Sequence, residues 1–157
     1  MTDRELLAEA LRLKSLDRAG WVRVGVPRPE SVAAHSWGVA LLALVRCPPG
    51  LDRERLVAMA LVHDLAEVRV GDITPHDGVP REKKKRRERE AATALFADHP
   101  ELWALWEEAD LGQTAEARFL KELDTLDMGL QGEIYASAGH DVEEFLVATE
   151  ATRARLP

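Results

Sequence analysis

The sequence predicts an all-α protein, and two observations carry this prediction. Apolar residues recur at helical spacing over most of the 157 residues. No stretch alternates apolar and polar residues for long, as a half-buried strand would. The chain is 46% hydrophobic and 31% charged, which is ordinary for a globular protein, and its length fits one domain.

Composition also limits the classes of function. The net charge of -7 argues against a large nucleic-acid footprint, because polymer binding needs a broad basic surface. Cys47 is the only cysteine, which excludes disulfides within the chain and Cys-based metal sites and favours a reducing compartment. No segment approaches the ~18 apolar residues of a membrane span, and no signal-peptide pattern is present. We therefore expect a cytoplasmic protein without a membrane or nucleic-acid polymer partner.

The first predicted helix covers residues 3–14, where leucines and alanines recur at roughly helical spacing. Residues 17–29 form a connector, because Gly and Pro interrupt any long regular element there. The connector carries Arg18 and Trp21 in an unusual concentration of guanidinium and indole groups. Taken alone, such residues more often are solvated or cover the core than bind a ligand.

A second helix is predicted from Ser31 to Val45, before Pro48 and Pro49 stop it. It is apolar around most of its circumference, which predicts a central position in the fold. His35 is the exception on this helix. A lone His in such a place is more often a packed, hydrogen-bonded side chain than a ligand.

The third helix is predicted to begin at Asp52, a suitable N-cap, and to carry an apolar run into His63 and Asp64. Placing a carboxylate beside an imidazole in a buried helix has a desolvation cost unless something compensates. A bound cation is the simplest compensation, and a neutral His63 bonded to Asp64 is the alternative. Glu67, one turn further, would share a helix face with both.

A loop over residues 71–80 contains Asp72, and a strongly basic run follows at residues 81–90. Acidic residues are interspersed in this run, so we interpret it as a solvated helix face and not as a nucleic-acid site. Pro100 then opens a short helix whose tryptophans, Trp103 and Trp106, are assigned to the core or to an interface.

The longest predicted helix covers residues 114–138 and contains Asp124 and Asp127. Either carboxylate could pair with Lys121 at the surface or reach inward, and periodicity does not decide between these orientations. Asp141 with Glu144 resembles a capping box, which predicts the start of a last helix.

Together these residues resemble a known family. His35, the His63-Asp64 doublet and Asp124 reproduce the H…HD…D order of the HD-domain metal-dependent phosphohydrolases. The resemblance covers about residues 10–135 and implies a compact HD-domain helical bundle that forms a homodimer. It implies one domain over residues 1–157, with a core at about 30–135 and terminal helices packed on it. Four segments resemble the small 5′-deoxynucleotidase branch: Pro29-Glu30-Ser31-Val32, Val62 to Glu67, Gly71-Asp72-Ile73 and Glu122-Leu123-Asp124.

The resemblance also implies residue roles. Glu67 and Asp72 would serve catalysis, and Arg18 would bind the phosphate. Trp21 would press against the sugar, where related enzymes distinguish deoxyribose from ribose. Two residues separate Arg18 from Trp21, as in the eukaryotic branch, whereas the two are adjacent in familiar bacterial members. One divalent metal would be bound by His35, His63, Asp64 and Asp124.

The function expected from this resemblance is hydrolysis of deoxyribonucleoside 5′-monophosphates to deoxyribonucleoside and phosphate. The mixed nitrogen and oxygen ligands suit Co²⁺, Mn²⁺, Fe²⁺, Zn²⁺ or Mg²⁺ without distinguishing among them. His76, His99 and His140 fall in no ligand pattern, which favours one metal over two. The alternatives are another HD-type nucleotide phosphohydrolase, acting on phosphodiesters or pyrophosphates, and a non-catalytic nucleotide sensor.

Overall fold

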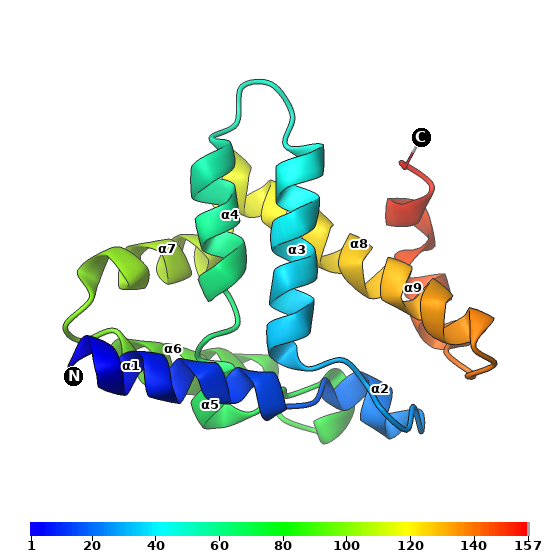
Figure 1. The fold of residues 1–157 in the computed structure, drawn as a ribbon, viewed down its shortest axis with the longest axis horizontal. Coiled ribbons are helices and arrows are strands. Elements are labelled where there is room, and N and C mark those ends of the chain that lie inside the picture. The colour runs from blue at the N-terminus through cyan, green and yellow to red at the C-terminus, as the bar shows by residue number, and fades with distance from the viewer. Residues whose placement is uncertain (157) are drawn as a thin grey trace.

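A computed structural model describes residues 1–156 and confirms the predicted all-α class (Figure 1). Within these residues, extended pairing is limited to one isolated bridge between Asp17 and Ser31. Two 3₁₀ turns cover Leu11–Ser15 and Pro75–Asp77. The α-helices are α1 (Asp3–Ala10), α2 (Ala19–Arg23), α3 (Val32–Arg46), α4 (Arg53–Val62), α5 (Glu67–Val70), α6 (Arg81–Leu95), α7 (Pro100–Leu111), α8 (Ala115–Ser137) and α9 (Glu143–Arg153).

The helices α3, α4 and α8 form the centre of the fold, as the apolar circumference of α3 predicts. Figure 1 shows α3 and α4 side by side, with α8 crossing them. Each has a side-chain N-cap, which satisfies a backbone N–H that the helix itself leaves free. Ser31 caps α3, Asp52 caps α4 as predicted, and Thr114 caps α8. Their shared core includes Val39, Ala43, Leu56, Met59 and Leu123.

Two smaller clusters attach the remaining helices. One joins α1, α6 and α7 through buried residues such as Leu6, Leu95, Phe96 and Trp106. The other consists of Trp21, Val26, Tyr135 and Val142, and it holds α2 and the start of α9 against α8. The connector at residues 17–29 is therefore folded onto the core, where it places Arg18 beside the loop at residues 71–74.

Three predicted details differ from the structure. The first helix is α-helical only to Ala10 and continues as a 3₁₀ turn. The predicted capping box at Asp141 and Glu144 is wrong, because α9 begins at Glu143 after Val142 and has no side-chain cap. Val142 is buried in the Trp21 cluster, so apolar packing fixes this helix start instead.

The third difference affects the site. Helix α4 ends at Val62, so His63 and Asp64 lie in a turn and not inside the helix. Hydrogen bonds between residues three apart replace the α-helical bonds between residues four apart. Leu65 N–H donates to Val62 O, and Glu67 N–H donates to Asp64 O. The turn directs the chain away from α4 and places Glu67 at the start of the separate helix α5.

In the part of the chain that the structure describes, no helix combines the length and apolarity needed to cross a membrane.

Candidate metal centre

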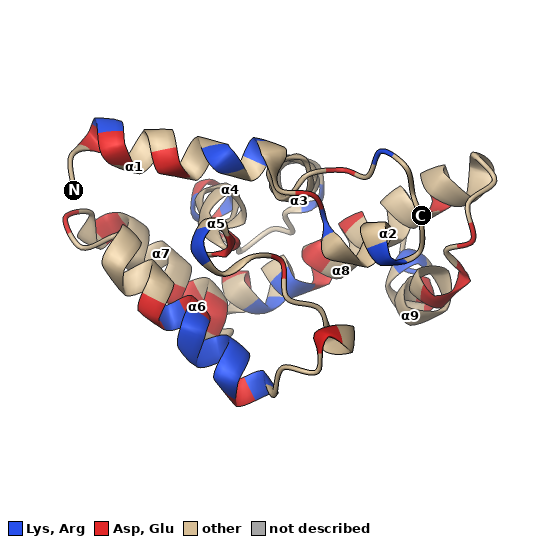
Figure 2. Cartoon of the chain, turned by 90° about the horizontal axis from the view of Figure 1, so that it is seen from below, with Lys and Arg blue, Asp and Glu red and all other residues tan. Residues whose placement is uncertain are grey.

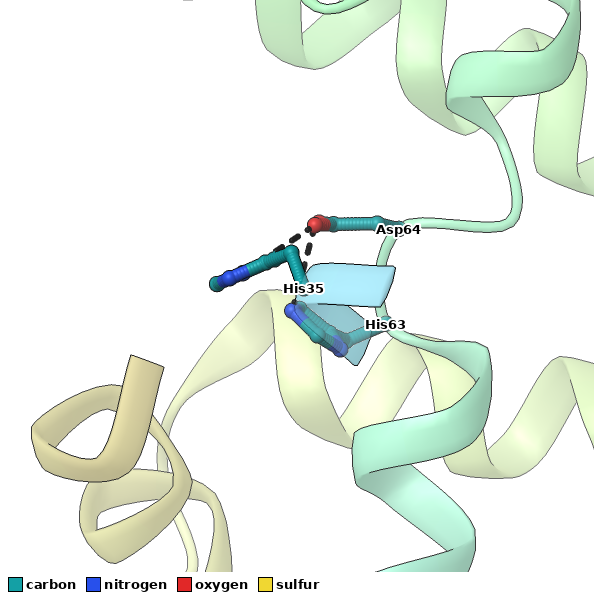
Figure 3. Close-up of side chains that lie close together, drawn as sticks. All are labelled: His35, His63 and Asp64. Atoms are coloured by element: carbon teal, nitrogen blue, oxygen red, sulfur yellow. Dashed lines mark ion pairs between the residues drawn. The ribbon is translucent and has the colours of Figure 1, made fainter. Parts of the chain in front are cut away.

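Three side chains lie close together, one from α3 and two from the turn that follows α4 (Figure 3). His35 lies on α3 with no exposed surface, and His63 and Asp64 follow the last residue of α4. The Asp64 Oδ2 atom lies 3.2 Å from His63 Nε2 and 3.7 Å from His35 Nε2. These three potential ligand atoms all lie within 4.8 Å of one another, which is close enough to share one cation.

Asp124 approaches the same place from α8. Its Oδ1 lies 3.1 Å from His35 Nε2, so its carboxylate reaches inward and does not pair with Lys121. The Asp124 side chain is 41% exposed, against 18% for Asp64. The structure thus groups three of the four predicted metal ligands, and the fourth, Asp124, contacts this group through His35 from the solvent side.

The two imidazoles are oriented in the same way. His63 Nδ1 lies 2.8 Å from the carbonyl oxygen of Ala60, and His35 Nδ1 lies 2.7 Å from Asp127 Oδ2. Both Nε2 atoms are buried and make no well-formed hydrogen bond within the described chain. A metal-ligating His has this arrangement, with one ring nitrogen held by an acceptor and the other left for the ion. The cluster is therefore capable of binding a divalent metal.

The charges in the cluster also call for a cation. Burial alone would lower the pKa of His35, but the carboxylates of Asp124 and Asp127 outweigh it and raise the pKa to about 10. Burial would raise the pKa of Asp64, yet the neighbouring His63 and His35 lower it below its usual range. Without a metal, protons on the imidazoles balance the carboxylates. A divalent ion would supply the same positive charge to the Nε2 atoms.

Glu67 is a buried carboxylate beside the cluster. Its side chain is 5% exposed, and its Oε2 atom has no hydrogen-bond partner among the described residues. Burial, reinforced by the negative charges of Asp64 and Asp72, raises its pKa well above the ordinary value for Glu. The protonated form of Glu67 is therefore favoured more than in a solvated Glu, which suits a group that exchanges a proton within the site.

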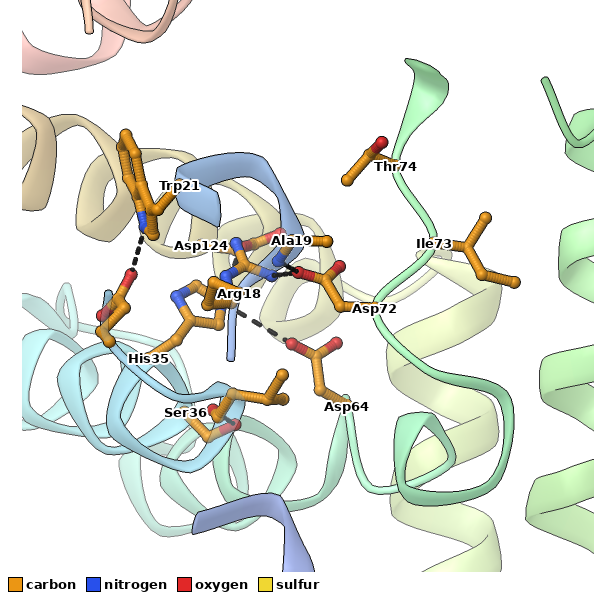
Figure 4. Close-up of polar contacts among 12 residues, drawn as sticks. Arg18, Ala19, Trp21, His35, Ser36, Asp64, Asp72, Ile73, Thr74 and Asp124 are labelled. Carbon is orange, nitrogen blue, oxygen red and sulfur yellow. Dashed lines mark hydrogen bonds and ion pairs between the residues drawn. The ribbon is translucent and has the colours of Figure 1, made fainter. Parts of the chain in front are cut away.

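Asp72 joins the loop after α5 to the connector (Figure 4). Its Oδ2 accepts a hydrogen bond from the backbone N–H of Ala19 at 2.8 Å and lies 3.8 Å from Arg18 Nη1. The Arg18 guanidinium also lies in the field of Asp64, which helps to keep its pKa raised despite burial. Asp72 thus holds the Arg18 segment over the metal cluster.

Trp21 is more deeply buried than we expect for a side chain that presses against a bound sugar. Its side chain is 2% exposed and packs against Tyr135 and Phe145, with ring centroids 5.1 and 4.2 Å away. Its Nε1–H donates to Glu30 Oε1 at 2.9 Å (Figure 4). Trp21 is therefore a fixed part of the wall, and its single polar atom is already used.

Two cavities lie in this region, and only the first is lined by residues of the cluster. A cavity of about 310 Å³ is lined by His63, Asp64, Glu67 and Asp124. A second cavity of about 360 Å³ is lined by Arg18, Trp21 and Asp72. We call them the metal-side cavity and the connector cavity. Lys84 lines both, and its Nζ donates to Ile73 O at 2.7 Å.

Sequence reasoning missed two contributors. The sequence leaves a surface and an inward orientation open for Asp127 and gives it no role, although its spacing of three from Asp124 places both on one face of α8. Lys84 was assigned to a solvated face, but Arg81, Lys84 and Lys85 line the metal-side cavity. Figure 2 shows how basic residues gather along α6. His76, His99 and His140 lie outside the groups of potential ligands found among the described residues.

Known proteins are similar to this chain in sequence and in fold. The chain matches the HD domain family over residues 10–154. It is 47% identical over 129 residues to a protein of Bos taurus named 5′-deoxynucleotidase HDDC2, covering 79% of this chain and 63% of that protein. The chain thus spans somewhat less than two thirds of the length of this relative.

Two solved structures extend the comparison. A conserved hypothetical protein from Pyrococcus furiosus superimposes with a TM-score of 0.82 at 32% identity, over 97% of this chain and 90% of that one. The HD phosphohydrolase DatZ of cyanophage S-2L, bound to dA and one catalytic Zn²⁺ ion, superimposes with a TM-score of 0.63 at 27% identity. That match covers 99% of this chain and 85% of DatZ. Sequence, fold and the His-Asp cluster agree, and the chain belongs to the HD domain family.

Proposed function

We propose that this protein is a metal-dependent phosphomonoesterase that hydrolyses deoxyribonucleoside 5′-monophosphates. One observation carries the proposal: two buried Nε2 atoms without well-formed hydrogen bonds converge on Asp64, which lines the metal-side cavity. The name of the bovine relative and the dA bound to DatZ support a nucleotide substrate.

The metal would be held by His35, His63, Asp64 and Asp124. When bound, one divalent ion supplies a Lewis acid that lowers the pKa of water and offsets negative charge on phosphoryl oxygens. The fit rests on the ligand chemistry and on the unpartnered Nε2 atoms. Co²⁺, Mn²⁺, Mg²⁺, Fe²⁺ and Zn²⁺ all suit this set of imidazole and carboxylate ligands.

The two proposed catalytic carboxylates would then have different tasks. Glu67 has a buried free oxygen and a raised pKa, which suits a group that transfers protons to or from the reacting oxygens. Asp72 is already bound to Ala19 N–H and lies near Arg18, which suits a group that orients the substrate. We assign proton transfer to Glu67 and orientation to Asp72.

Substrate binding would occupy the connector cavity. Arg18 can donate paired hydrogen bonds to a phosphate, a geometry that lysine cannot reproduce. Trp21 would border the sugar as a rigid apolar surface. Because its Nε1–H is bound to Glu30, Trp21 would discriminate deoxyribose from ribose by shape and not by a hydrogen bond.

A second reaction class has its own support. The metal-side cavity extends from the cluster toward Arg81, Lys84 and Lys85, so it offers cationic groups beyond the position of a single phosphate. A nucleoside di- or triphosphate could place its further phosphates there. Hydrolysis of a pyrophosphate bond is therefore the alternative to the monophosphatase.

We propose one HD domain over residues 1–157 and a homodimer. Trp106 is buried, so it is unsuited to an interface, whereas α3 exposes 65% of Trp37 and 72% of Val45. Light scattering after chromatography should report a dimer, and Trp37→Glu should shift it toward monomer. A monomeric wild type would contradict this proposal.

We propose the cellular location and the absence of a nucleic-acid partner from the composition of the chain. A cytoplasmic location fits the single Cys47, and the absence of a nucleic-acid polymer partner fits the net charge of -7. Imaging of a tagged chain tests the first statement, and electrophoretic mobility of labelled DNA and RNA tests the second.

The substrate assignment is tested by phosphate release from a panel of nucleotides. The panel contains deoxyribonucleoside and ribonucleoside 5′-monophosphates, 3′-monophosphates, di- and triphosphates and cyclic dinucleotides, each with metal-stripped protein and one added metal. Selective release from deoxyribonucleoside 5′-monophosphates supports the proposal. Preference for di- or triphosphates would favour the alternative reaction. Tight nucleotide binding without turnover would indicate a sensor.

A further inference from the structure

A buried contact stands behind the candidate metal centre. Asp127 Oδ2 lies 2.7 Å from the Nδ1 atom of His35, on the side of the ring that faces away from Asp64. The Asp127 side chain is 13% exposed and His35 has no exposed surface. An ionised carboxylate only accepts hydrogen bonds, so Nδ1 carries the hydrogen in this contact. When a metal ion replaces the proton on the other ring nitrogen, His35 Nε2 is the nitrogen whose lone pair binds the ion.

The opposite helix has a residue that makes this contact possible. Gly38 follows His35 by three positions on α3 and faces Asp127 across the helix pair. A Cβ atom at position 38 would lie 2.1 Å from Asp127 Oδ1 and 2.9 Å from its Cγ. Even alanine would therefore displace the carboxylate. Glycine weakens a helix interior, so its presence here calls for a specific reason.

The contact also has a rigid neighbour. Glu30 offers an oxygen within 4.8 Å of the potential ligand atoms of His35 and Asp127. Glu30 is fixed twice, because its Oε1 accepts from Trp21 Nε1 and its backbone N–H donates to Tyr135 Oη at 2.7 Å. The back of His35 is thus enclosed by groups whose positions are set by the core.

We propose that Asp127 is a positioning residue that fixes the tautomer and ring orientation of His35, and that Gly38 is required because it leaves room for the Asp127 carboxylate. This inference rests on the proposed metal centre. It adds a residue that touches neither metal nor substrate but decides how well one ligand is presented.

The first test is a Co²⁺ titration of metal-stripped protein, followed by visible absorption. Asp127→Ala should weaken Co²⁺ affinity by about 10- to 100-fold, the usual cost of losing the partner of a ligating His. Asp127→Asn, which keeps an acceptor oxygen, should lose less. Glu122→Ala is the matched control, because this exposed carboxylate on the same helix pairs with Arg155 at 3.2 Å.

The second test asks whether Gly38 acts through Asp127. Gly38→Ala alone should weaken Co²⁺ binding although alanine favours a helix. In the Asp127→Ala background the same change should cost nothing further, because the clash partner is gone. Independent, additive losses would overturn the role given to Gly38.

NMR spectra distinguish a specific effect on His35 from a general loss of structure. In Zn²⁺-loaded protein, long-range ¹H–¹⁵N spectra should show His35 with a protonated Nδ1, and Asp127→Ala should broaden or shift these signals while His63 keeps its own. If wild type binds no metal, the proposed centre fails and this inference with it. If wild type binds but Asp127→Ala matches it within about twofold, only this inference is overturned.

Discussion

The metal-side and connector cavities share Lys84 in their walls but differ in how their polar groups are satisfied. On the metal side, two imidazole nitrogens and one Glu67 oxygen are buried without well-formed hydrogen bonds. In the connector cavity, Trp21 Nε1 is bound to Glu30 and Asp72 is bound to Ala19 N–H. Buried unsatisfied groups have a free-energy cost that a ligand can relieve, whereas satisfied groups form a rigid wall.

We infer from this difference that the two cavities have separate tasks. The metal side should contribute chemistry, and changes there should abolish turnover. The connector side should contribute shape and phosphate recognition, and changes there should weaken but not abolish turnover.

The largest effect is expected from removing a shared ligand. Asp64→Ala should reduce phosphate release to the level of metal-stripped protein and remove stoichiometric metal binding, because Asp64 faces both imidazoles. Phosphate assays and metal analysis of the purified variant measure this. Glu90→Ala, an exposed carboxylate on α6, is the control. An Asp64→Ala variant with wild-type turnover in metal-defined buffer would refute the cluster's role.

Glu67→Gln should separate chemistry from metal binding. We expect kcat to fall by about 100- to 10,000-fold, the usual contribution of a general acid or base, with Co²⁺ affinity retained. Glu88→Gln is a close control, because Glu88 lines the same cavity and burial also raises its pKa. Equal losses in both variants would mean that the cavity's total charge matters and not Glu67 itself.

Arg18→Lys tests the connector side. Replacing the forked guanidinium by a single ammonium should lower kcat/KM by roughly 10- to 100-fold, the equivalent of one charge-assisted hydrogen bond. Arg23→Lys is the matched control, since Arg23 lines the same cavity but pairs with Glu144 at 2.7 Å. Complete loss of activity in Arg18→Lys would show that the division between the cavities is drawn too sharply.

The last prediction concerns the free energy of unfolding, and not turnover, in metal-stripped protein at different pH values. The pKa of His35 is raised to about 10 in the folded chain, against ~6.5 when unfolded. The folded state therefore binds more protons, and its extra stability is complete below ~6.5 and lost as pH rises toward about 10. Thermal unfolding at several pH values should show this decline, and His35→Gln should flatten it. Stability that rises over this range would contradict the charge balance.

The sequence predicted the parts of the structure that depend on local pattern. The central position of α3 followed from its apolar circumference, and the cap at Asp52 followed from residue type. The convergence of His35 with His63 and Asp64 followed from family resemblance and not from periodicity. Residues 63–64 were expected inside a helix, but the helix ends at Val62, since a break of this kind carries no Gly or Pro signal.

Features that depend on tertiary contacts were not predictable in the same way. Asp127 pairs with a residue 92 positions away, and only the crossing of α3 and α8 brings the two together. The burial of Trp21 depends on Tyr135 and Phe145, which belong to the far end of the chain. Lys84 resembles its neighbours in sequence, but it lines both cavities and bonds to the Ile73 carbonyl oxygen.

The most direct test of the proposed metal centre follows metal binding and catalysis in one titration. Metal-stripped protein is titrated with Co²⁺ while visible absorption and phosphate release from a deoxyribonucleoside 5′-monophosphate are recorded together. The account predicts that both signals rise in parallel and saturate at one ion per chain. Phosphate release that is independent of added metal, or saturated metal binding without any release from that substrate, would contradict it.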